Sequence, residues 1–176
     1  MRNPGVGLRW FVAVLLALLV APCSWAMDEE LERVLQSQGV RFHVEGQVLG
    51  DMVIGSRGTV EVIWVNRRLA EALSRAQFPP QWLVDQVQKL DSVPRGHSLF
   101  AVAVRANKPF TVDLNRLIIG VPLRRELLLT REDRMLTELS SGEESFFGVL
   151  APVTVKPGSF IPVGYGEDRA ELKVSR

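Results

Sequence analysis

The chain has 176 residues, of which 47% are hydrophobic, 23% charged and 7% aromatic, and its formal net charge at pH 7 is +1. This composition is that of an ordinary globular protein with an additional apolar segment. It excludes a collagen-like chain, a disordered charged tail, a disulfide-stabilised miniprotein and a polytopic membrane protein.

The first 26 residues have the three parts of a cleavable signal peptide. Two arginines supply positive charge, and the apolar run Phe11–Ala21 is shorter than the roughly 20 residues that span a bilayer. Ser24 and Ala26 are small residues at the positions that signal peptidase reads, so we expect cleavage after Ala26 and a mature chain that starts at Met27. The sequence therefore predicts a signal peptide over 1–26 and an extracytoplasmic protein, periplasmic or secreted. A retained signal anchor is the alternative.

Cys23 offers a second route of processing. The segment Leu19–Cys23 resembles the lipobox of bacterial lipoproteins, in which the cysteine is lipidated, although Pro22 stands where that pattern has glycine or alanine. Cleavage after Ala26 would instead leave a mature domain with no cysteine, because the chain contains only one. That outcome excludes disulfides, thiolate nucleophiles and cysteine zinc sites.

The mature chain has the size and charge of a single neutral domain. Removing 26 residues leaves 150, and 19 basic residues then stand against 20 acidic ones. A chain of this length can bury one self-sufficient core, so we expect a single mostly-β domain over 27–176. The balanced, scattered charges give no electrostatic footprint for nucleic acid and no polybasic tract for a membrane surface.

Hydrophobic periodicity gives the first elements of the mature chain. Apolar residues at helical spacing predict a short amphipathic helix from Asp28 to Gln38, which Gly39 ends. Alternation with a period of two then predicts strands over 40–45 and 59–65, with a small strand at Met52–Ile54 between glycine turns. Helical spacing returns over 66–90, where Phe78-Pro79-Pro80 predicts two helices that meet at an elbow.

The chain after residue 97 is predicted to be extended throughout. Its strands are expected at Ser98–Arg105, Leu117–Leu123, Glu126–Thr130, Ser145–Leu150, Val153–Lys156, Phe160–Val163 and Ala170–Val174. The first of these has apolar residues on both faces, which is typical of a central strand that is covered on both sides.

These elements predict a mainly β fold, an antiparallel immunoglobulin-like β-sandwich with an N-terminal helix and a two-helix insert at about 66–90. Residues 40–176, with a strand such as Leu99–Arg105 followed by short extended segments, resemble bacterial exported immunoglobulin-like sandwiches in architecture. The resemblance implies no role for any particular residue, because folds of this class host many functions.

Few residues carry chemistry. His43 and His97 have no metal-ligand spacing, and His43 is expected to point to solvent beside Arg41. Ser98 follows His97, but adjacency in sequence does not assemble a nucleophile with its base and orienting acid. The glycine motifs match no phosphate-binding loop. We therefore predict no catalytic, cofactor-binding or metal residue, and no cofactor.

Other clusters are interpreted structurally. The acidic pairs 29–30, 132–133, 143–144 and 167–168 are typical of helix starts and turns. The charged groups 124–126 and 131–134 bracket Leu127–Leu129, which is typical of a strand whose ends are protected against edge pairing, with an anion-binding patch as the alternative. Large aromatic residues offer a platform for carbohydrate or peptide, with Trp64 assigned to the core; they are Trp64, Trp82, Phe78 and Tyr165.

The sequence thus predicts an exported, non-catalytic binding or structural module of the bacterial cell envelope that engages another protein. Exposed sheet edges and the helical insert are the expected contact surfaces. It predicts no nucleic-acid partner, and contact with the membrane only through the signal sequence or a lipid on Cys23. Two alternatives stay open: a small extracytoplasmic hydrolase that uses His43, His97, Ser98 and nearby acids, and a carrier of a small apolar ligand between helices and sheet.

Overall fold

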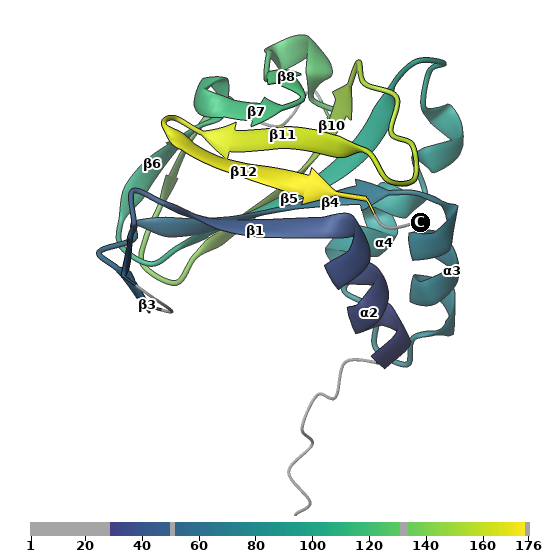
Figure 1. Cartoon of the computed structure of the whole chain (residues 1–176), viewed down its shortest axis with the longest axis horizontal. Helices are drawn as coiled ribbons and strands as arrows, with labels where there is room; N and C mark the ends of the chain where they lie inside the picture. The colour runs from purple at the N-terminus through teal and green to yellow at the C-terminus, as the bar shows by residue number, and fades with distance from the viewer. Residues whose placement is uncertain (1–28, 50–51, 131–133, 175–176) are drawn as a thin grey trace, which may run out of the picture.

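A computed structural model of the chain describes residues 29–49, 52–130 and 134–174 (Figure 1). The helices are α2 (Glu29–Gln38), α3 (Arg67–Arg75) and α4 (Gln81–Val87), with 3-10 helices η1 (Leu90–Ser92), η2 (Leu114–Arg116) and η3 (Arg125–Leu127). The strands are β1 (Gly39–Val44), β2 (Gln47–Leu49), β3 (Met52–Ile54), β4 (Gly58–Val65), β5 (Ser98–Ala106), β6 (Phe110–Asp113), β7 (Leu117–Ile119), β8 (Val121–Pro122), β9 (Leu136–Leu139), β10 (Glu144–Ala151), β11 (Phe160–Tyr165) and β12 (Asp168–Lys173). The predicted mainly β fold with antiparallel sheets and a few short helices is confirmed.

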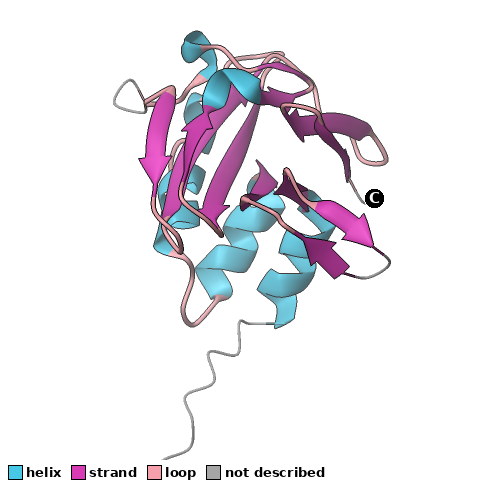
Figure 2. Cartoon of the chain, turned by 90° about the vertical axis from the view of Figure 1, so that its left-hand side faces the viewer, coloured by secondary structure: helices cyan, strands magenta, loops and turns pink. Residues whose placement is uncertain are grey.

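Two four-stranded sheets contain most of the strand residues. The first sheet has the strand order β1-β4-β5-β10 and the second has the order β12-β11-β7-β8, and neighbouring strands in both are antiparallel. Two further pairs, β2–β3 and β6–β9, lie outside them. Figures 1 and 2 show the helices α2 and α3 side by side on the side of the first sheet that faces away from the second.

The larger hydrophobic core lies between the two sheets. Alternate residues of β5 point into it, and Phe100, Val102 and Val104 are almost completely buried there. Leu99 and Ala101, on the opposite face of β5, are buried in a second cluster beneath the helices. The prediction of a central strand that is covered on both sides is therefore confirmed.

The helical insert begins and bends where the sequence predicts. The side chain of Asn66 caps α3, because its Oδ1 accepts a hydrogen bond from the backbone N–H of Leu69 at 3.0 Å. Leu69 is fully buried and joins the second cluster. Pro80 precedes α4, so the elbow at Phe78-Pro79-Pro80 separates two helices as predicted.

Four of the strands that were predicted after residue 97 are confirmed by β5, β10, β11 and β12. The predicted strand Leu117–Leu123 is divided into β7 and β8, because Gly120 has a φ of 69° and turns the chain there. The strands β2, β6 and β9 lie in short segments for which the sequence predicts none. Each of them belongs to a two-stranded pair outside the main sheets: β2 pairs with β3, and β6 pairs with β9.

The predicted strand Glu126–Thr130 is wrong. The chain forms the 3-10 helix η3 there and then touches β10 at one bridge, Leu128 to Val149, and at one hydrogen bond from the N–H of Leu129 to the carbonyl of Gly148 at 2.9 Å. The charged residues around it therefore do not protect strand ends. Residues 131–133 of this motif lie outside the described residues.

The predicted strand Val153–Lys156 is also wrong, and Ser98 supplies the reason. Its hydroxyl donates a hydrogen bond to the carbonyl of Val153 at 2.8 Å and accepts one from the N–H of Val155 at 3.3 Å. A side chain thus satisfies the backbone groups that a neighbouring strand would otherwise satisfy.

The predicted signal peptide, the cleavage site and Cys23 lie outside the described residues. Within the described ranges, none of the helices combines the length and the apolar character that crossing a membrane requires.

Tyr165, at the end of β11, ties the second sheet to β6. Its side chain is buried, and its phenol oxygen accepts a hydrogen bond from the backbone N–H of Asp113 at 2.7 Å. The guanidinium of Arg116 lies over the ring, 5.0 Å from its centroid. Burial raises the pKa of the Tyr165 phenol above its ordinary value of 10.0, against the smaller opposing effects of the Asp113 N–H and Arg116.

We expect Tyr165→Phe to lower the free energy of unfolding by about 1–3 kcal/mol, because the N–H of Asp113 loses its partner inside the protein. In the unfolded state of the unsubstituted protein, Tyr165 ionises at its ordinary pKa near 10.0. This value lies below the raised pKa of Tyr165 in the folded state. Above about pH 10 the unfolded state therefore binds fewer protons than the folded state, so the free energy of unfolding of the unsubstituted protein falls as pH rises.

Urea unfolding of both proteins from pH 8 to pH 11 measures this difference. The stability gap between native protein and variant should narrow above about pH 10. Because the chain has a single tyrosine, phenolate absorbance reports Tyr165 alone. A gap that stays constant, or an absorbance titration at the ordinary pKa in the folded protein, would contradict the burial argument.

Candidate functional site

The helices cover only one half of the outer face of the first sheet. Ile63, Val65, Leu99 and Ala101 lie on this face beneath the helices and are buried. Further along the same strands the residues on this face are partly or fully exposed. The outer face therefore has a covered half and an open half.

The open half consists of two cross-strand rows that the strand register defines. In each row the residues come from β1, β4, β5 and β10, in that order. The rows are Arg41, Glu61, Ala103 and Phe146, and His43, Thr59, Arg105 and Glu144. We call these eight residues the open face.

Charged pairs of opposite sign dominate the open face. Arg41 Nη2 lies 3.2 Å from Glu61 Oε1, and Arg105 Nε lies 3.7 Å from Glu144 Oε1. Both pairs join neighbouring strands, and both arginine side chains are well exposed. Exposed ion pairs contribute little to the free energy of unfolding. Stability alone therefore does not explain why these two pairs lie on this face.

An aromatic stack closes one end of the open face. Trp82 of α4 packs on Phe146 of β10 with ring centroids 4.8 Å apart and an interplanar angle of 23°. Phe146 remains 39% exposed. Ala103 of β5 is the register partner of Phe146. The small side chain of Ala103 leaves a depression in the sheet surface between the charged pairs.

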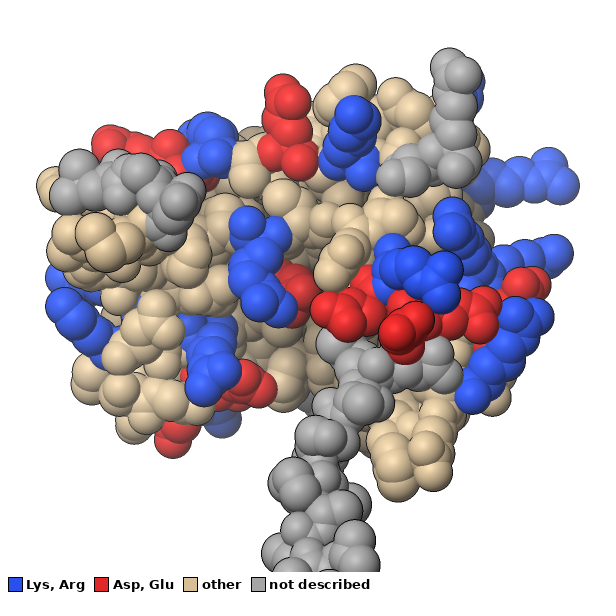
Figure 3. All heavy atoms as spheres, turned by 60° about the horizontal axis from the view of Figure 1, so that its bottom comes forward, with Lys and Arg blue, Asp and Glu red and all other residues tan. Residues whose placement is uncertain are grey.

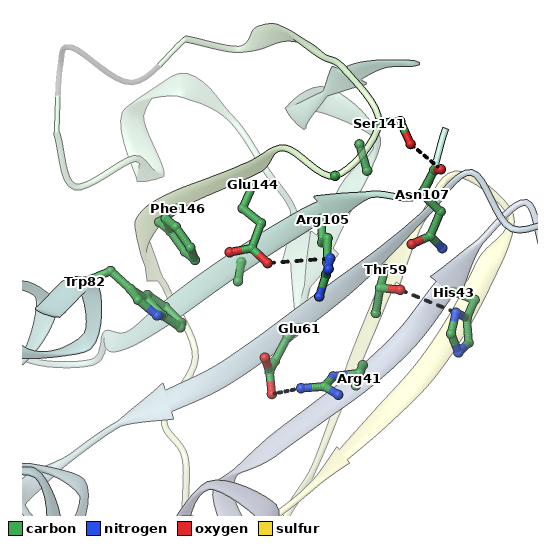
Figure 4. Close-up of a pocket in the computed structure, with 13 residues that line it drawn as sticks. Arg41, His43, Thr59, Glu61, Trp82, Arg105, Asn107, Ser141, Glu144 and Phe146 are labelled. Carbon is green, nitrogen blue, oxygen red and sulfur yellow. Dashed lines mark hydrogen bonds and ion pairs between the residues drawn. The ribbon is translucent and has the colours of Figure 1, made fainter. Parts of the chain in front are cut away.

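Together these residues surround a hollow of about 760 Å³, shown in Figure 4. The turns that carry Asn107 and Ser141 form the end opposite Trp82, and the Ser141 hydroxyl donates to the carbonyl of Asn107 at 2.8 Å. Figure 3 shows acidic and basic side chains intermixed on this side of the molecule, without a large patch of one sign.

A second hollow adjoins the first. It has a volume of about 550 Å³, lies between α2, α4 and the sheet, and shares Arg41, Glu61 and Trp82 with the open face. Its other lining residues include apolar side chains from the helices and strands; they are Leu35, Val40, Ile63, Pro80 and Leu83. We call the two hollows together the groove: it has a charged end on the open face and an apolar end beneath the helices.

The structure separates His43 from the other two residues of the hydrolase alternative, His97 and Ser98, which line one hollow together with Asp91. His43 is on the open face, as its strand position predicts, with Nδ1 3.5 Å from Thr59 Oγ1. His97 lines a different hollow, near Trp64 and Asp91, which shares no lining residue with the groove. The Ser98 hydroxyl is already hydrogen-bonded to the backbone of residues 153 and 155.

The aromatic residues do not form one platform. Trp82 lines the groove, whereas Phe78 is 74% exposed at the α3–α4 elbow. Trp64 packs against the larger core, in agreement with its assignment. Tyr165 is buried in that core, so its place in a platform is wrong.

Most carboxylates of the acidic pairs within the described residues take the structural roles that were expected, but Glu144 lies on β10 and belongs to the open face. Glu29 and Glu30 begin α2. The Glu143 carboxylate accepts a hydrogen bond from the N–H of Ser140 at 2.7 Å in a turn, and Asp168 accepts one from the N–H of Glu45 at 2.9 Å. The pair 132–133 lies outside the described residues.

Sequence reasoning missed most of the groove. Glu144 and Phe146 are 39 and 41 positions after Arg105 in the chain, and they lie near it only because β5 pairs with β10. The alternation within each strand could have indicated that Ala103 and Arg105 share a face, as do Glu144 and Phe146. The register between the strands was needed to join the two sets.

No protein-family model, curated protein sequence or solved structure matches the chain. Among the residues that the structure describes, no three histidine, cysteine or acidic side chains gather where a metal ion could be held. The chemistry of the groove itself therefore carries the functional argument.

Proposed function

We propose that the chain is an exported, non-catalytic binding module of the bacterial cell envelope, and that it engages another protein through the groove. The observation that carries this proposal is the half-covered outer face of the first sheet. A sheet face with exposed paired charges and an aromatic stack beside helices is suited to contact with a partner.

The surface position of the charged pairs in the groove supports binding over catalysis. General acid–base groups are tuned by burial or by like charges, and both carboxylates of the open face instead lie beside arginines on the surface. The groove is large enough for several side chains of a partner, since small-molecule sites occupy about 300–1,000 Å³.

Export is part of the proposal and rests on the leader pattern of residues 1–26. The expected measurement is the intact mass of the chain recovered from the envelope fraction. A chain that starts at Met27 supports a free exported module, and a lipidated chain that starts at Cys23 supports a tethered one. A chain that retains the leader in the cytoplasm contradicts export.

We infer further that the two sheets form an immunoglobulin-like sandwich. In that fold, strands A, B and E are neighbours in one sheet and C, F and G in the other, with C′ beside C in variable-type domains. The neighbours β4, β5 and β10 follow the order A, B and E, and β8, β7, β11 and β12 follow C′, C, F and G. Amide NOEs between β5 and β10 and between β7 and β11 test this order, and other pairings would contradict it.

Photo-crosslinking tests protein engagement directly. A photoreactive amino acid replaces Ser141, which is exposed at the rim of the groove, and in a matched strain replaces Glu171, which is exposed on β12 of the second sheet. Irradiation of intact cells is followed by mass spectrometry of the adducts. We expect one reproducible protein adduct from position 141 and none from position 171.

Two results would overturn the proposal. Adducts of equal yield from both positions would indicate non-specific collision, and no protein adduct from position 141 would remove the groove as a protein-binding surface.

A further inference from the structure

We propose that the groove binds an extended segment of the partner's polypeptide chain, with one apolar side chain at the helix end and polar groups of both signs on the open face. This inference rests on the proposed function and names the chemistry of the partner. Four observations carry it: the continuity of the groove, its charge balance, its apolar end and its length.

The groove is continuous. Arg41, Glu61 and Trp82 line both hollows, so the space between α2 and α4 adjoins the open face at these three residues. The floor is the face of the sheet and not its edge. Recognition there depends on side chains, because the backbone groups of β4 and β5 are already paired within the sheet.

The charge balance selects against a ligand of one sign. Each arginine of the open face lies beside a glutamate, at 3.2 Å for Arg41 and Glu61 and at 3.7 Å for Arg105 and Glu144. An anion attracted to either arginine is repelled by the adjacent carboxylate. A cation attracted to either glutamate is repelled by the adjacent arginine. A ligand that presents donors and acceptors close together can satisfy both members of a pair. Polypeptides and oligosaccharides both have this property.

The apolar end favours a polypeptide over an oligosaccharide. Leu35, Val40 and Pro80 are partly exposed in the hollow between the helices and the sheet, next to Trp82, with Glu32 and Gln36 at its rim. An aliphatic or aromatic side chain gains free energy when it leaves water for such a site, whereas a sugar ring offers hydroxyl groups that would lose their hydrogen bonds there.

The length of the groove fits an extended chain. Along β4, the floor runs from Ile63 at the apolar end to Thr59 at the charged end. The four residue-to-residue steps between them span about 13 Å at roughly 3.3 Å each. A partner segment of similar length in an extended conformation can therefore place an apolar anchor beneath the helices while residues about four positions away meet the charged pairs.

A displayed library of random linear peptides tests this inference. The full chain, expressed with its own leader and purified from the envelope fraction, is the bait, and the Ala103→Trp variant is used for depletion. Ala103 is the low point of the open face, so a tryptophan fills the hollow. Thr111→Trp is the matched control, because Thr111 is exposed on β6 and does not line the groove.

We expect enriched peptides that share an apolar residue and, about four positions away, charged residues. Fluorescence anisotropy should show their affinity falling at least about tenfold in Ala103→Trp and staying within about twofold in Thr111→Trp. The double variant Arg105→Glu with Glu144→Arg keeps the exposed pair and the net charge but reverses its order, so it preserves folding. It should also weaken binding about tenfold.

Three outcomes would overturn the inference. Enriched peptides that bind the native protein and Ala103→Trp equally would place the contact outside the groove. Binding of neutral oligosaccharides, lost in Ala103→Trp, would assign the groove to glycans. A protein adduct at position 141 without any enriched peptide would show that the partner presents a folded surface, and in that case the proposed function stands while this inference fails.

Discussion

Replacing Phe100 with alanine should lower the free energy of unfolding by about 3–5 kcal/mol, the largest effect that we expect from a single substitution in this chain. Phe100 is fully buried on the central strand β5 and belongs to the core that both sheets share. Its removal takes a large apolar surface out of the core and leaves a cavity, because a tightly packed interior relaxes only in part.

A matched substitution exists elsewhere in the chain. Phe160 is 57% exposed at the start of β11, so Phe160→Ala removes the same side chain from the surface. The Lys173 ammonium lies over its ring, 5.8 Å from the centroid. We expect this variant to change stability by less than about 1 kcal/mol. Urea denaturation followed by circular dichroism measures both values, and similar losses in the two variants would contradict a shared core around Phe100.

Leu69→Ala should cost about 2–5 kcal/mol. Leu69 is fully buried in α3, one turn after the helix cap. It packs in the second cluster, which lies between the helices and the first sheet. This cluster includes Leu99 and Ala101 of β5, so the two cores lie on opposite faces of the same strand. If 27–176 is one cooperative domain, loss of the helix contacts should lower the stability of the strands as well.

The measurement for Leu69→Ala compares two probes of unfolding. In a chain that starts at Met27, tryptophan fluorescence reports Trp64 and Trp82. Far-ultraviolet circular dichroism reports the secondary structure. Coincident transitions at a lower urea concentration are expected for one domain. A first transition confined to the helices would instead make the insert a separate unit. The control is Leu136→Ala, since Leu136 is 58% exposed on β9 and its truncation should be nearly neutral.

The sequence by itself determined the elements that depend only on residues that are neighbours in the chain. The alternation in β5 gave both of its faces, and Phe78-Pro79-Pro80 gave the elbow between α3 and α4, because proline lacks the N–H that a helix interior needs. The same reasoning predicted Glu126–Thr130 as a strand and was wrong, because a strand also requires a partner. Backbone pairing of that segment with β10 is limited to Leu128 and Leu129.

Only the tertiary structure decided where the binding surface lies. Each strand of the first sheet shows its own alternation, but the sequence of one strand carries no information about its register with the next. The register of β5 with β10 brings Arg105 to Glu144, and α4 brings Trp82 to Phe146. These contacts join residues far apart in the chain, so they are fixed by how the sheet and helices pack together and not by any local pattern.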